Sequence, residues 1–65
     1  MTAYGFAKVV NAALVEAGKA KVLPPQMFYT YFKKGFIKVE ARNEAGAKEW
    51  AAAYIKKHEA TLPVA

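Results

Sequence analysis

No cysteine occurs in this chain of 65 residues, and that absence limits what the chain can fold into. Short domains bury a smaller fraction of their surface than long ones, and many depend on disulfides or a structural metal. Here there is neither a disulfide nor a thiolate metal site, and one histidine, His58, cannot form a zinc cluster alone. A dense apolar core must hold the chain together. The composition, 55% hydrophobic and 14% aromatic, is rich enough for one small domain.

A first amphipathic helix is predicted over residues 3–17, where apolar side chains recur at intervals of three and four. Thr2 precedes it as a plausible N-cap. Gly18 follows the last periodic residue, at the position where a left-handed backbone commonly ends a helix.

The second helix is predicted to begin at Pro24-Pro25, because proline suits the first turn of a helix, and to include residues 26–34. It should end at Gly35, with lysines in its last turn where the helix dipole favours positive charge. The aromatic content of residues 27–32 makes a strand the competing interpretation. The prolines before this segment and the Lys-Lys-Gly after it favour the helix.

Residues 36–41 alternate between apolar and polar side chains, which indicates a short, half-buried strand. Asn43 can cap a third helix that ends near His58. We therefore expect a mostly α fold, a three-helix helix–turn–helix domain over residues 1–60 with a short strand or reduced wing between the second and third helices. Residues 61–65 have no pattern and are expected to form a loose tail.

The expected core combines apolar side chains from all three helices and the strand, since none of these elements can bury its apolar face alone. Its predicted members are Phe6, Val9, Val10, Leu14, Phe28, Phe32, Ile37, Trp50 and Tyr54.

The net charge of +5 arises entirely from the middle of the chain. Residues 18–39 contain five lysines and no acidic residue, whereas the five other basic residues are balanced by the five glutamates outside that segment. A basic segment between balanced ones suggests an anionic partner, with nucleic acid the commonest and a membrane surface second, although no membrane partner is expected here. A basic but otherwise ordinary surface is the alternative on charge alone.

The second helix separates two kinds of side chain onto opposite faces. One face carries large apolar groups, and the other carries amide, phenol, hydroxyl and ammonium groups that can reach base edges and phosphate oxygens. The polar face consists of Gln26, Tyr29, Thr30 and Lys33. Together with the acid-free segment, this face makes double-stranded DNA the expected partner, with the helix in the major groove.

The segment 25–37, PQMFYTYFKKGFI, followed by Lys48-Glu49-Trp50, resembles the recognition helix and final helix of excisionase-like and MerR-like winged helix–turn–helix proteins. The resemblance implies a small transcriptional regulator or a recombination directionality factor of phage or bacterial type. It also implies DNA contacts on the polar face of the second helix. The chain after Gly35 is too short for a full two-stranded wing, so Lys38 and Arg42 are the candidates for a contact from a reduced wing.

The candidate DNA-binding residues lie on the second helix and in the basic segment around it. They are Pro25, Gln26, Tyr29, Thr30, Lys33, Lys34, Lys38, Lys19, Lys21 and Arg42. One short helix supplies few base contacts, so self-association or cooperative binding on adjacent sites is expected, as is contact with a recombinase or another protein partner.

The other function classes are less well supported by the residues present. Catalysis is not expected in a chain with no Cys, Asp or Ser, and no catalytic, metal or cofactor site is predicted. No segment is long and apolar enough to span a bilayer, no leader is recognised, and a cytoplasmic location, in a bacterial cytoplasm or nucleoid, is expected. The main alternative is a three-helix protein-interaction module that uses Tyr29 and Phe36 as exposed anchors.

Overall fold

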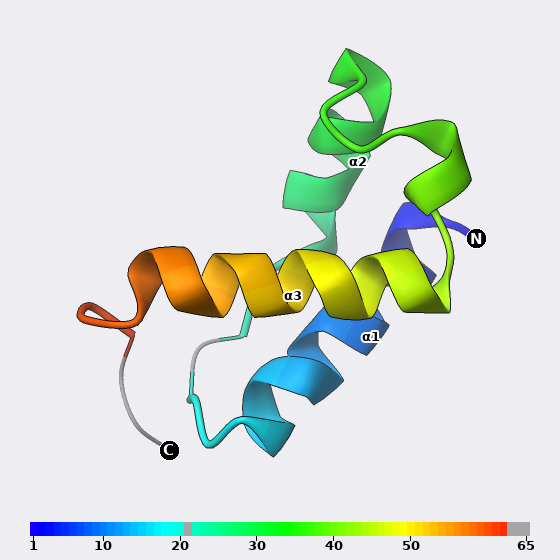
Figure 1. Cartoon of the computed structure of the whole chain (residues 1–65). Helices are drawn as coiled ribbons and strands as arrows, with labels where there is room; N and C mark the ends of the chain where they lie inside the picture. Colours follow the sequence, from blue (N-terminus) through cyan, green and yellow to red (C-terminus); the bar gives the residue numbers. More distant parts are fainter. Residues whose placement is uncertain (21, 63–65) are drawn as a thin grey trace.

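A computed structural model describes residues 1–20 and 22–62 (Figure 1). Its elements are three α-helices, α1 (Ala3–Glu16), α2 (Pro25–Lys34) and α3 (Glu44–His58), and a short 3₁₀ helix, η1 (Val39–Ala41). The predicted mostly α, three-helix domain is therefore confirmed, and each helix begins and ends within about a residue of its expected limits.

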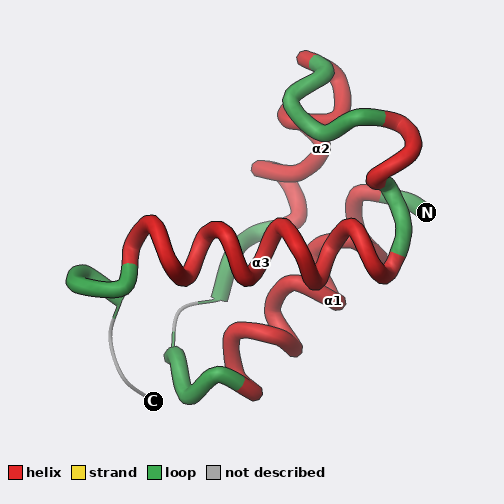
Figure 2. The backbone as a smooth tube through the Cα atoms, viewed as in Figure 1, coloured by secondary structure: helices red, strands yellow, loops and turns green. Residues whose placement is uncertain are grey.

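The helix α1 is the element on which the other two pack, because it contacts both α2 and α3 extensively. In Figure 1, α3 crosses in front of α1, and α2 rises above both. Figure 2 shows that the connection after α2 curves back through η1 to the start of α3. The C-terminal half of α2 therefore projects from the body formed by α1 and α3, as Figure 1 shows.

The helices α1 and α2 end in the same backbone motif. Gly18 and Gly35 both adopt the left-handed conformation, with φ of 77°, which glycine reaches without steric cost. After α1, the N–H of Lys19 donates to Leu14 O at 2.9 Å; after α2, the N–H of Phe36 donates to Tyr31 O at 2.9 Å. These bonds satisfy carbonyls that the helix ends would leave unpaired. The predicted ends at both glycines are confirmed.

The strand expected over residues 36–41 does not form. The backbone instead bends and enters η1, where the N–H of Ala41 donates to Lys38 O at 2.9 Å. Ile37 is buried, but Val39, expected on the same side, is 74% exposed. A lone strand leaves its backbone groups without partners, and the described residues supply no second strand to pair with it. The prediction of a short strand or a reduced, stranded wing is therefore wrong.

The core is centred on aromatic rings contributed by all three helices. Phe6 and Phe28 are fully buried, with ring centroids 5.3 Å apart, and the ring of Trp50 lies 5.0 Å from that of Phe28. Of the predicted core, five residues are buried, namely Phe6, Val10, Leu14, Phe28 and Ile37. The other four are partly buried and pack against them: Val9, Phe32, Trp50 and Tyr54.

A side-chain amide fixes the connection between α1 and α2. The Asn11 Nδ2 group donates to Leu23 O at 2.9 Å, and the Leu23 N–H donates to Asn11 Oδ1 at 2.7 Å. The side chain thus pairs with both backbone groups of one residue, whose own side chain is buried. This contact holds the long connection between α1 and α2 against α1.

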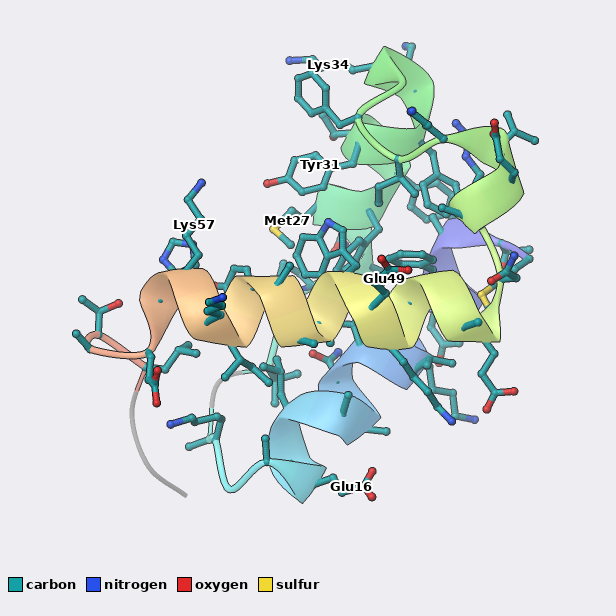
Figure 3. The ribbon with its side chains drawn as sticks, viewed as in Figure 1. Glu16, Met27, Tyr31, Lys34, Glu49 and Lys57 are labelled. Atoms are coloured by element: carbon teal, nitrogen blue, oxygen red, sulfur yellow. The ribbon has the colours of Figure 1, made fainter. Side chains whose placement is uncertain are left out.

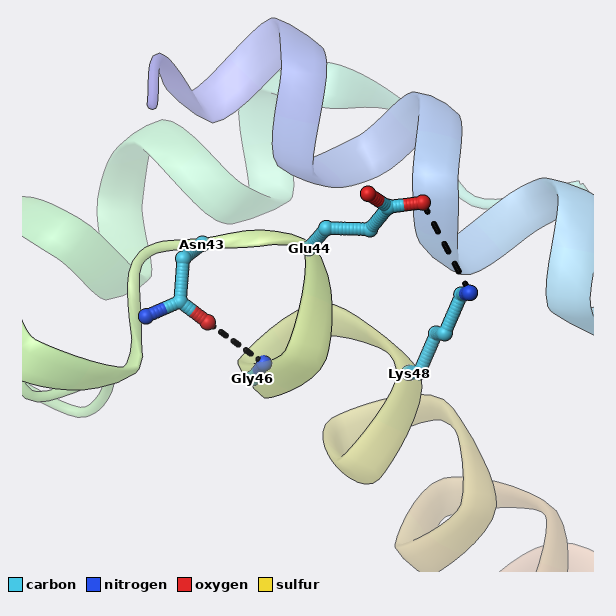
Figure 4. A network of polar contacts seen from close by, with 4 residues as sticks. All are labelled: Asn43, Glu44, Gly46 and Lys48. Atoms are coloured by element: carbon cyan, nitrogen blue, oxygen red, sulfur yellow. Dashed lines mark hydrogen bonds and ion pairs between the residues drawn. The ribbon is translucent and has the colours of Figure 1, made fainter.

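The start of α3 is capped as predicted, and it lies very close to η1. Asn43 Oδ1 accepts a hydrogen bond from the Gly46 N–H at 2.8 Å, as Figure 4 shows, and the Asn43 amide donates to Glu40 O at 2.8 Å. Figure 4 also shows the exposed ion pair between Glu44 and Lys48, with 3.6 Å between nitrogen and oxygen. A Cβ on Gly46 would collide with the carbonyl group of Ala41. Glycine is required here by the close approach of two backbones.

The segment after α3 is attached at its start. Three donors, the N–H and hydroxyl of Thr61 and the N–H of Leu62, bond to the carbonyl oxygen of His58 at 2.9–3.1 Å. Leu62 is buried. The expectation of a loose tail from residue 61 is corrected for these two residues, because orphan carbonyl groups at a helix end accept such bonds. Residues 63–65 lie outside the described residues.

Replacing Gly46 by alanine should destabilise the fold. We expect Gly46→Ala to lower the free energy of unfolding by about 1–3 kcal/mol, the usual cost of overpacking. Gly5, at the equivalent third position of α1, is the matched control, because a Cβ there meets only ordinary contacts at 3.4 and 3.5 Å. Gly5→Ala should stabilise by about 0.5–1 kcal/mol, as alanine does in helices. Urea unfolding followed by circular dichroism measures both, and a stabilising Gly46→Ala would contradict the close approach.

Candidate nucleic-acid interface

The predicted division of α2 into two faces is confirmed by burial. Gln26, Tyr29, Thr30 and Lys33 are all exposed, and the Tyr29 side chain is 58% accessible. On the other side, Phe28 is fully buried, while Met27, Tyr31 and Phe32 are half-buried. The polar face is therefore free to meet a partner along the whole helix. We call these four exposed residues the outer face of α2.

One hydroxyl of the outer face is already engaged. The Thr30 Oγ1 group donates to the carbonyl oxygen of Gln26 at 3.2 Å, four residues earlier in the helix. This bond fixes the threonine rotamer and turns its hydroxyl hydrogen toward the helix backbone. The oxygen keeps lone pairs that can accept from a base, and the methyl group remains available for apolar contact.

Three lysines gather around the end of α2. Lys33 and Lys34 occupy the last turn, and Lys38 follows in the connection to η1; all three are exposed. Figure 3 shows Lys34 at the tip of α2, away from the body of the molecule. Its Nζ atom lies 6.0 Å from the centroid of the Phe36 ring. Between Pro25 and Val39 the charged residues are all lysines, so the end of α2 carries a local positive charge.

The basic segment of the sequence does not form one surface. The turn after α1, which contains Lys19, lies at the bottom of Figure 1, and the end of α2 lies at the top. The molecule extends 30 Å along its longest axis. Lys19 is half-buried, and Lys21 lies outside the described residues. Lys33, Lys34 and Lys38 thus lie in the last turn of α2 and shortly after it, whereas Lys19 lies in the turn after α1, because α2 carries the chain away from that turn.

Arg42 serves the fold, a role that sequence reasoning missed. Its Nη2 group donates to Phe32 O at 2.8 Å, its Nε to Ile37 O at 3.1 Å, and its guanidinium carbon lies 4.5 Å from the centre of the Phe32 ring. The side chain is half-buried. It ties the end of α2 to the chain leading into η1, so it holds the backbone that carries Lys38. Arg42 lies five and ten residues after its two carbonyl partners in the sequence, and these separations match no pattern that would have predicted the contact.

Pro25 opens α2 and is half-buried. It also borders a groove of about 430 Å³ between the start of α1 and the connection to α2. The groove is lined mainly by apolar groups, with Lys8 and Asn11 as its polar members. Pro25 thus lies at the base of α2, and the lysines lie at its tip.

No family model, curated protein or solved structure matches the chain. The resemblance to excisionase-like and MerR-like proteins therefore stays a prediction. No helix of the described residues is both long and apolar enough to cross a membrane. Within residues 1–20 and 22–62, no group of three or more acidic or histidine side chains is placed to hold a metal ion.

Replacing Arg42 by lysine should weaken the fold although the charge is kept. An ammonium group lacks the planar fork that reaches two carbonyls while stacking on a ring, so we expect Arg42→Lys to cost about 1–3 kcal/mol of unfolding free energy. Lys38→Ala is the control, because an exposed side chain away from such contacts changes stability by about 0.5 kcal/mol or less. Both are measured by urea unfolding. Equal stabilities of the two variants would show that Arg42 is not a structural clamp.

Proposed function

We propose that this chain binds double-stranded DNA, with α2 in the major groove, and works as a small transcriptional regulator or an excisionase-type recombination directionality factor. The observation that carries the proposal is that α2 projects from the body with an exposed polar face and a lysine-rich tip (Figures 1 and 3). A cytoplasmic location, in a bacterial cytoplasm or nucleoid, belongs to the same proposal.

The dimensions of α2 support this arrangement. A helix of ten residues is about 15 Å long, and the major groove of B-DNA, about 12 Å wide, admits a helix. The outer face lies on the side of α2 away from Phe28, which is buried against Phe6 of α1 and Trp50 of α3, so it faces away from the body and can approach a groove.

The chemistry of the outer face supplies base contacts, and the tip supplies phosphate contacts. A glutamine amide can pair bidentately with adenine, so Gln26 is the main candidate for reading sequence. Thr30 offers a methyl and an acceptor oxygen, and Tyr29 a phenol. Lys33, Lys34 and Lys38 would neutralise phosphates.

A single α2 makes few base contacts, so the proposal includes several copies on one DNA. Two or more domains on adjacent or inverted half-sites would raise the overall affinity without new contacts within each domain. Contact with a recombinase or another protein would serve the same purpose.

One observation favours a second candidate, a protein-interaction module. Tyr29 and Phe36 are 58% and 68% exposed, and aromatic side chains anchor many protein interfaces. The salt dependence of the binding affinity distinguishes the two candidate functions. Binding through several lysines weakens steeply as salt rises, whereas an aromatic protein interface does not.

Loss of a tip lysine should weaken duplex binding and reduce its salt dependence. Each contacted phosphate contributes about 0.9 to the slope of log affinity against log salt, so Lys33→Ala and Lys34→Ala should each lower that slope by about 1 unit. Lys56→Ala, in the last turn of α3, removes the same charge elsewhere and is the matched control. Fluorescence anisotropy with a random duplex at several salt concentrations provides the values. If all three variants show the same affinity and the same salt slope, the end of α2 does not contact the duplex.

Removal of the Gln26 amide should reduce specificity. After a preferred duplex has been selected from a random library, we expect Gln26→Ala to lose about 1–3 kcal/mol of discrimination at one base pair while binding scrambled duplex as before. Lys38→Ala should instead weaken both duplexes similarly. Anisotropy on the two duplexes tests this, with stoichiometry measured on the same DNA. A uniform loss for Gln26→Ala would reduce the outer face to phosphate binding.

A further inference from the structure

A row of aromatic rings runs along the angle between α2 and α3. It begins at the exposed Phe36 after α2, continues to Tyr31, crosses to α3, and follows that helix at intervals of four residues. The successive centroid distances are 5.6 Å for Phe36–Tyr31, 6.3 Å for Tyr31–Trp50, 5.2 Å for Trp50–Tyr54 and 4.5 Å for Tyr54–His58. The Trp50 and Tyr54 rings are nearly parallel, at 13°.

The row borders a hollow and is not sealed inside the core. A space of about 240 Å³ is lined by six residues, Tyr31, Trp50, Ala53, Tyr54, Lys57 and His58. The four rings among them are half-buried, so each has part of its surface open. Figure 3 shows Tyr31 projecting from α2 and Lys57 rising from α3 on the same side of the angle. A core cluster would have closed this space, because protein interiors leave few voids larger than a water molecule.

Charge narrows the choice of occupant. Lys57 lines the hollow, and no aspartate or glutamate does. Farther along the row, Lys34 lies beside Phe36. The positive charge of Lys57 would repel a quaternary ammonium ligand. A ligand that joins a planar ring to a negative charge suits the hollow better, because its ring can stack on the aromatic walls and its charge can pair with Lys57. The volume is below the range of roughly 300–1,000 Å³ typical of drug-sized ligands, so one small ring system is the right size.

We propose that this hollow binds an unpaired base of single-stranded DNA, with the base stacked on the rings of Trp50, Tyr54 or Tyr31 and Lys57 contacting an adjacent phosphate. Aromatic side chains beside a cationic path are the general means by which proteins hold single strands. The site is separate from the outer face of α2, since Tyr31 lies on the opposite side of that helix. The choice of DNA over RNA rests on the proposed duplex binding; the stacking site itself does not.

Trp50 reports directly on the site, because it is the only tryptophan in the chain. Titration with an oligo(dT) strand at low salt should quench its emission. An abasic strand of the same length carries the same phosphates but no bases, and it should bind roughly 5- to 140-fold more weakly if one base stacks. Equal affinity for the two strands, or unchanged Trp50 emission, would overturn the proposal. Oligo(rU) binding as tightly as oligo(dT) would overturn the assignment to DNA.

The variant Lys57→Ala should weaken oligo(dT) binding and lower its salt slope by about 0.7, the value for one phosphate of a single strand. Lys56→Ala is the matched control, because Lys56 neighbours Lys57 in sequence but does not line the hollow. Both residues are exposed, so both variants should fold, which circular dichroism checks. Equal losses for the two variants would mean charge-driven binding without a built site and would overturn the proposal.

The outer-face variant Lys33→Ala separates this site from duplex binding. It should weaken duplex binding while leaving the quenching of Trp50 by oligo(dT) unchanged. Duplex binding without any quenching by oligo(dT) would overturn the stacking site and leave the proposed function standing. If oligo(dT) quenches Trp50 but the protein binds no duplex DNA, the stacking site is supported and the proposed function is overturned.

Discussion

Phe6 lies where the three helices meet, and its ring is the contact on which the fold most depends. It is fully buried and approaches Phe28 and Phe32 of α2 at 5.3 and 5.4 Å and Trp50 of α3 at 6.5 Å. The helix α1 packs against both α2 and α3 and so presents this ring to both, while Trp50 of α3 also contacts Phe28 and Tyr31 of α2 directly. In a chain without disulfides, burial of these rings replaces covalent linkage, because aromatic side chains bury the largest areas and gain further from edge-to-face packing. Their arrangement also decides which surfaces remain open.

The small residues of α3 explain why its large ones are partly exposed. The buried residues of α3 are Ala47 and Ala51. Alanines at the contact let α3 lie close to α1, in the same way that Gly46 lets the first turn of α3 lie against η1. Trp50 and Tyr54, next to these positions on the helix, are consequently left at the edge of the contact, where Trp50 reaches Phe28 and Tyr31 of α2. The aromatic row is therefore a product of how α3 packs.

Local signals predicted the helices well, and long-range contacts account for what was missed. Thr2, Asn43 and the glycines after α1 and α2 act within a few residues, so their effects were readable from the sequence. The alternation that suggested a strand was also local, but a strand needs a partner, and pairing is decided by the rest of the fold. The clamp by Arg42 joins groups that have no sequence pattern in common. Likewise, the separation of Lys19 from the tip lysines follows from the direction of α2, which composition does not encode.

The helix α2 carries the outer face and contributes Tyr31 to the hollow, while having only one fully buried residue, Phe28. A ten-residue helix is only marginally stable by itself in water, so its order must come from the packing of that ring and its half-buried neighbours on α1 and α3. Changes on the inner side of α2 would therefore melt the helix and abolish any activity that depends on it. Substitutions on the outer face, and at Lys57 on α3, leave this packing intact. Only such substitutions can separate a binding role from a structural one, since both proposed surfaces are built around the same buried ring.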